Sequence, residues 1–108
     1  MTKGQLSGPN RWLVERCQHI NFGSITFQVR GGEPDLGRPR SQVRTLRIAG
    51  GVNGPRPEVA RDDFELRHEH IALLEQLTRL PDGTRVRVKV AHGLPGAFID
   101  LLEEEQAA

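Results

Sequence analysis

The sequence predicts an α+β domain in which two αββ units form a four-stranded, mainly antiparallel sheet with two helices on one face. Stretches with apolar residues at helical spacing are followed by stretches in which every second residue is apolar. This order of helix, strand, strand occurs twice, in residues 10–49 and 62–102, and the 108 residues suffice for one domain only. Since neither unit can bury its own apolar face, we expect the two to share one core.

The first unit is expected to start with a helix at about residues 11–20, after a flexible tail of residues 1–9 that is rich in Gly, Ser and Thr. Asn10 has the side chain of an N-cap. Three apolar residues follow one another at i, i+4 and i+7 and form one stripe: Leu13, Cys17 and Ile20. Gly23 can take the positive φ of the turn that ends the helix.

Residues 24–30 alternate between apolar and polar side chains and predict a half-buried strand. A loop of residues 31–41, which contains glycine and proline, then leads to a second strand at about residues 42–49. In this second strand we expect Leu46 and Ile48 to share the buried face.

The second unit follows a connection rich in glycine and proline, residues 50–60. Its helix is expected to begin at Asp62, which forms a capping-box pattern with Glu65, and to end before Pro81. The apolar stripe of this helix is Phe64, Ile71, Leu74 and Leu77, widened by Leu73 and Leu80. Residues 84–90 alternate strictly and predict a strand.

The last segment, residues 97–102, is expected to be a strand, although residues 98–102 could also form a helical turn. Residues 103–108 are acidic and are expected to form a loose tail. No apolar run reaches the length that crosses a bilayer and no signal-peptide pattern follows Met1, so we expect a cytoplasmic protein.

The residue types that carry catalysis or hold metals occur without their usual patterns. The single cysteine excludes an intramolecular disulfide, and we interpret Cys17 as a small buried residue, with a reactive thiol as the alternative. His68 and His70 diverge on a helix and do not chelate one metal. We therefore expect no metal, no cofactor and no enzymatic activity; an enzyme would need a pocket built around His19, His92 and the loop of residues 50–57.

The charge is divided between the two halves of the chain. Residues 1–61 contain 10 basic and 4 acidic residues, whereas residues 62–108 contain 5 basic and 10 acidic ones. Strand parity places several basic side chains on the sheet face away from the helices, and two further arginines lie in the adjoining loop. The candidate binding residues are Arg30, Arg38, Arg40, Arg47, Arg85, Arg87 and Lys89.

Clustered guanidinium groups on an open sheet suit a phosphate backbone or an acidic protein surface. Aromatic stacking residues are absent from the expected face, which disfavours recognition of single-stranded bases. The alternative is a solvated surface, or one paired with residues 103–105 or with a second subunit.

One stretch resembles a known family. Leu13-Val14-Glu15 and the run from Ile20 to Phe27, with Phe22-Gly23-Ser24 as its distinctive piece, are similar to the small bacterial YezD-like domain of unknown function. The resemblance covers residues 13–32 and implies a bacterial cytosolic module, with no catalytic residue to transfer.

The leading hypothesis is a non-enzymatic binding or adaptor module whose basic sheet face meets an anionic partner, nucleic acid first. The alternative is a protein–protein interaction domain or homodimer with no nucleic-acid role. It would use the sheet edge or the loops of residues 31–42 and 50–61.

Overall fold

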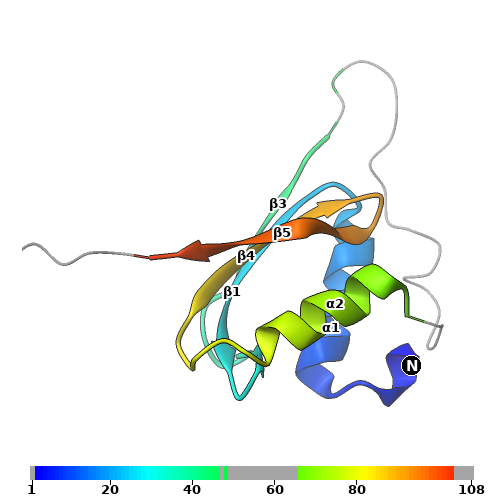
Figure 1. Cartoon of the computed structure of the whole chain (residues 1–108). Coiled ribbons are helices and arrows are strands. Elements are labelled where there is room, and N and C mark those ends of the chain that lie inside the picture. Colours follow the sequence, from blue (N-terminus) through cyan, green and yellow to red (C-terminus); the bar gives the residue numbers. More distant parts are fainter. Residues whose placement is uncertain (1, 47, 49–65, 104–108) are drawn as a thin grey trace, which may run out of the picture.

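The computed structural model describes residues 2–46, 48 and 66–103, and its fold is α+β. A short 3₁₀-helix, η1 (Lys3–Gln5), precedes the two α-helices, α1 (Gly8–Ile20) and α2 (His68–Leu77). Five strands form one antiparallel sheet (Figure 1): β1 (Gly23–Arg30), β2 (Glu33–Pro34), β3 (Ser41–Arg44), β4 (Arg85–Ala91) and β5 (Leu94–Leu102).

β1 and β4 form the centre of the sheet. They pair antiparallel from Gly23 opposite Val90 to Gln28 opposite Arg85. β5 lies beyond β4 at one edge, and β3 and β2 share the other edge along the two ends of β1. The sheet has five strands where the sequence predicted four, because Glu33–Pro34 of the expected loop folds back onto the end of β1.

Both helices pack on one face of the sheet, as predicted. Buried residues of α1 and α2 form a single cluster with the inward side chains of β1 and β4. The strict alternation predicted for these two strands is confirmed, since their inward residues are buried: Ile25, Phe27, Val29, Val86, Val88 and Val90. Trp12 of α1 extends the cluster and meets Phe27 edge to face, with ring centroids 6.1 Å apart.

Residues 2–7 pack against the domain, in contrast to the expected flexible tail. α1 begins at Gly8, with Ser7 rather than Asn10 as its N-cap, because the Ser7 hydroxyl accepts a hydrogen bond from the Asn10 amide at 3.3 Å. Lys3 is only 1% exposed, and its ammonium lies 2.9 Å from the Glu15 carboxylate. Burial raises the pKa of Glu15, but the hydrogen bonds and charges of Lys3 and then Arg11 outweigh burial and hold it below its usual value.

α2 begins at His68 in the described part of the chain, later than the expected start at Asp62. The expected capping pair, Asp62 and Glu65, lies outside the described residues. The observed N-cap is Arg67, whose backbone N–H donates to Nδ1 of His70 at 3.3 Å. Neither α1 nor α2, the α-helices of the described ranges, is long and apolar enough to span a membrane.

The second strand of the first unit is shorter than predicted. β3 ends at Arg44, opposite Gly23, which is the first residue of β1. Beyond that point the chain has no strand of β1 to pair with, so Leu46 is 58% exposed and Ile48 is fully exposed instead of buried. The segment of residues 97–102 is a strand, one of the two predicted alternatives, and it starts earlier, at Leu94.

Candidate anion-binding face

The centre of the open sheet face carries a row of cations. Arg85, Arg87 and Lys89 are the outward residues of β4 and alternate with its buried valines. We call these three residues the basic row. All three are exposed, since both helices cover the opposite face of the sheet. Alternate residues of a strand lie roughly 7 Å apart, so the row presents its charges at regular intervals.

The neighbouring strand supplies uncharged polar groups beside the row. The register places Ser24 of β1 opposite Lys89, Thr26 opposite Arg87 and Gln28 opposite Arg85. These three polar side chains are half-buried. Hydroxyl and amide groups that flank basic side chains add hydrogen bonds to an anionic oxygen without adding charge.

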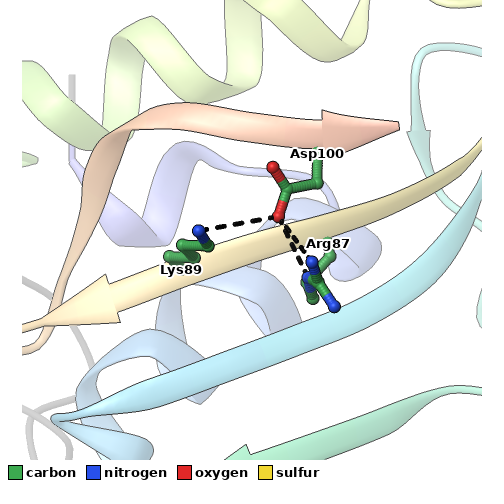
Figure 2. A network of polar contacts seen from close by, with 3 residues as sticks. All are labelled: Arg87, Lys89 and Asp100. Carbon is green, nitrogen blue, oxygen red and sulfur yellow. Dashed lines mark hydrogen bonds and ion pairs between the residues drawn. The ribbon is translucent and has the colours of Figure 1, made fainter. Parts of the chain in front are cut away.

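A single carboxylate faces the basic row (Figure 2). Asp100 of β5 lies directly opposite Arg87, and its Oδ2 is 3.0 Å from Nε and 2.9 Å from Nη2 of that guanidinium. The Lys89 ammonium lies 3.9 Å from the same oxygen. Asp100 is the only acidic residue among the outward positions of β1, β3, β4 and β5 in the described chain.

The compensation by Asp100 is partial. Arg87 is 44% and Asp100 35% exposed, and ion pairs with such exposure are worth only about 0–1 kcal/mol. Lys89 is 67% exposed and meets Asp100 only at the limit of ion-pair distance. Arg85 makes no ion pair within the described residues. Among the described residues, the basic row therefore retains two positive charges beyond the one that Asp100 balances. Of the acidic residues 103–105 that were expected as alternative partners, 104 and 105 lie outside the described residues.

A shallow depression of about 450 Å³ lies at the Lys89 end of the basic row. It combines two cations of the row and two hydroxyl groups with a surface that is mostly apolar. The residues that line it are Phe22, Gly23, Ser24, Val43, Thr45, Arg87, Lys89 and Val90. A phosphate or carboxylate group in this depression would meet both Arg87 and Lys89.

The other predicted binding residues are dispersed. Arg30 is exposed at the end of β1, two residues beyond Gln28, and Arg38 is exposed in the loop before β3. The guanidinium of Arg40 lies 4.9 Å from the centroid of the Trp12 ring, so it is held on the helical side and does not join the basic row. Arg47 lies outside the described residues.

One aromatic side chain, Phe22, lies closer to the open face than the sequence predicted, and a second, Phe98, is exposed at the sheet edge. Phe22 lines the depression and meets His92 edge to face, with a centroid separation of 4.8 Å. Phe98 of β5 is 81% exposed. Neither belongs to the two central strands, whose outward residues are polar apart from Ala91. Sequence reasoning missed Asp100 as well, because its place opposite Arg87 depends on the strand register.

Reactive side chains are not assembled elsewhere in the described residues. No group of three His, Cys, Asp or Glu side chains within them could hold a metal ion. Cys17 is completely buried, and burial raises the pKa of its thiol to about 12, which makes it an unreactive core residue at neutral pH.

No family model, no curated protein and no solved structure matches this chain. The similarity of residues 13–32 to the YezD-like domain therefore stays a hypothesis, and functional reasoning depends on the geometry of the open face.

Proposed function

We propose that this protein is a non-enzymatic binding module whose open sheet face binds an anionic partner, with nucleic acid as the first candidate. The observation that carries the proposal is the basic row on β4, with three exposed cations and one partly compensating carboxylate. Arginine forms bidentate hydrogen bonds with phosphate, and a row of such groups attracts a polyanion through counterion release.

The neighbours of the basic row favour contacts with the phosphate backbone over recognition of bases. Ser24, Thr26 and Gln28 are short or flexible polar residues that suit phosphate and sugar oxygens. Base stacking needs aromatic rings on the binding face, and the central strands present none there. We therefore expect binding that depends little on nucleotide sequence.

We also propose that the domain is built from two αββ units, and that it is a bacterial cytosolic module as the resemblance of residues 13–32 implies. In each half a helix is followed by strands that pair with one another: α1 with β1 and β3, and α2 with β4 and β5. Such a layout leaves one sheet face free of helices, which is the face that the basic row occupies.

Fluorescence anisotropy with labelled single- and double-stranded DNA and RNA tests the proposal, measured across a series of salt concentrations. We expect the logarithm of the binding constant to fall linearly with the logarithm of salt concentration. The triple variant Arg85→Ala, Arg87→Ala, Lys89→Ala should lose this binding. The matched control removes three exposed arginines that lie outside the basic row and the depression: Arg40→Ala, Arg67→Ala and Arg79→Ala.

Circular dichroism should show that both triple variants keep the fold, since every substituted side chain is exposed. Equal loss of binding in the two variants would mean that net charge, rather than the basic row, is responsible. No binding of the wild-type protein at low salt would refute the nucleic-acid proposal. An affinity capture with an acidic protein surface would then be the next experiment.

A further inference from the structure

β5 is an edge strand of nine residues, and β4 is the only strand that pairs with it in the described part of the chain. Among the described residues, the backbone N–H and C=O groups on its outer side therefore have no strand partner and can pair with another strand. Edge strands are commonly protected by charged side chains, by proline, by β-bulges or by an inward-pointing charge. In β5 these features lie near its start, at Pro95 and at the register shift opposite Val88 and Val90. The stretch from Ala97 to Leu102 has no proline and no lysine, and its one charged residue is Asp100, which pairs with Arg87.

An apolar groove of about 530 Å³ runs between β5 and α2. Its helical wall is one stripe of α2, formed by residues at i, i+1, i+4, i+5 and i+8: His68, Glu69, Ala72, Leu73 and Gln76. Its other wall is the stretch of β5 from Pro95 to Ile99, where Phe98 is 81% exposed. The open backbone edge and the exposed apolar surface thus occupy the same side of the domain.

We propose that a second copy of this chain covers this surface by pairing its own β5 antiparallel to the first, around a two-fold axis perpendicular to the sheet. A row of unpaired backbone groups is complementary to another extended strand. A two-fold interface also requires a patch that matches itself, because each residue meets its counterpart on the other copy.

The residues along the groove are complementary to a second copy of the same groove. The helical stripe is centred on Ala72, with Glu69 toward one end and Gln76 at the other. The axis sets α2 antiparallel to α2 of the second copy, so Ala72 lies near the axis and its small side chain allows close approach. The Glu69 carboxylate then faces the Gln76 amide of the second copy, which is a donor for it. An unrelated apolar peptide could fill the groove but would not form the two symmetric pairs between Glu69 and Gln76, so these residues favour a second copy of the chain.

The dimer would also have a consequence for the open face. Pairing through β5 keeps all the helices on one side and joins the two sheets into a continuous surface. Two β5 strands would then separate the two β4 strands, which places the two basic rows about 14 Å apart on the same face. The dimer does not depend on nucleic-acid binding, and the two proposals can fail separately.

Sedimentation equilibrium over a wide range of protein concentration tests the proposal. We expect a monomer–dimer equilibrium, and Ala72→Lys, at the centre of the interface, should raise its dissociation constant roughly tenfold or more. Glu75→Lys is the matched control, because it places the same side chain on an exposed position of α2 that does not line the groove. Alanine, glutamate and lysine are all good helix formers, so both variants should fold.

Distances between spin labels test the geometry directly. Cys17 is buried, so a cysteine introduced by Ala97→Cys is the one that a nitroxide label reaches in the folded protein. The two labels at position 97 should lie close together across the axis, whereas labels introduced by Arg38→Cys, near the opposite edge, should lie far apart.

A chain that stays monomeric at the highest concentration would refute the dimer. So would a dimer that Ala72→Lys leaves unchanged, or one in which the labels at position 97 are distant. A monomer that captures an extended apolar peptide in the groove would show that the surface serves another protein. The triple variant of the basic row should dimerise like the wild type, which separates this proposal from the nucleic-acid one.

Discussion

Asp100→Asn removes the one carboxylate that faces the basic row and leaves the size and shape of the side chain nearly unchanged. In the wild type the Oδ2 atom of Asp100 lies 3.0 Å from Nε and 2.9 Å from Nη2 of Arg87, and 3.9 Å from Nζ of Lys89. Because these groups are one-third or more exposed, the substitution should change the free energy of unfolding by no more than about 1 kcal/mol.

The effect on nucleic-acid binding should be larger than the effect on stability. Freeing one cation to neutralise one further phosphate steepens the salt dependence of the binding constant by about 0.7 to 0.9 in log–log slope. At 0.1 M salt this corresponds to a binding constant raised roughly fivefold to eightfold. Fluorescence anisotropy over a salt series measures both quantities for wild type and variant.

Glu75→Gln is the control for net charge, since it removes an exposed carboxylate from α2 on the helical side. It should change the affinity much less than Asp100→Asn. An Asp100→Asn variant that folds and binds no more tightly than the control would refute the reasoning that Asp100 restrains the basic row.

Three further predictions concern stability and reactivity. Burial lowers the pKa of His70 below its ordinary value of 6.5, so the unfolded chain binds a proton at this side chain more readily than the folded protein does. The free energy of unfolding should therefore decrease as the pH falls below 6.5. Urea unfolding at several pH values should show a weaker decrease in His70→Gln than in the exposed control His68→Gln. Cys17 should react with a thiol reagent only at the rate of unfolding, and fast modification of the native protein would contradict its burial. Gly23→Ala would place a Cβ 1.8 Å from the Val43 carbonyl oxygen at a φ of +150°, and should lower the free energy of unfolding by at least about 2 kcal/mol. Gly31→Ala, at a φ of +61° with open space around it, introduces backbone strain alone and should lower the free energy of unfolding by about 1 kcal/mol. Equal losses of stability in the two variants would contradict the clash at Gly23.

The central strands could be predicted from sequence because the alternation of apolar and polar residues fixes which face of each strand is buried. In β1 and β4 every second residue is apolar, and a shift by one position would expose the whole apolar set. The same pattern predicted that Arg85, Arg87 and Lys89 share the open face, and their exposure in the structure agrees with this.

Features that depend on long-range pairing could not be predicted in this way. The alternation of Leu46 and Ile48 suggested a buried face. The first residue of β1, Gly23, lies opposite Arg44, so β1 does not extend beside Leu46 and Ile48, and both are exposed. The place of Asp100 opposite Arg87 depends on a register shift between β4 and β5 that no local pattern reveals.

Side-chain competition decided the position of Arg40. Its place in a loop between two strands suggested that it would join the basic row. The ring face of Trp12 attracts the guanidinium to the helical side instead. Similarly, Ser7 replaces Asn10 as the cap of α1 because Pro9 suits the first turn of a helix.

The most direct test of the central proposal is an NMR titration of ¹⁵N-labelled protein with a short DNA or RNA duplex at low salt. The proposal predicts that amide shifts concentrate at the outward residues of β1 and β4 and around the depression at Lys89, and that they disappear at high salt. Shifts confined to α1 and α2, or no shifts at all, would contradict a binding site on the open face.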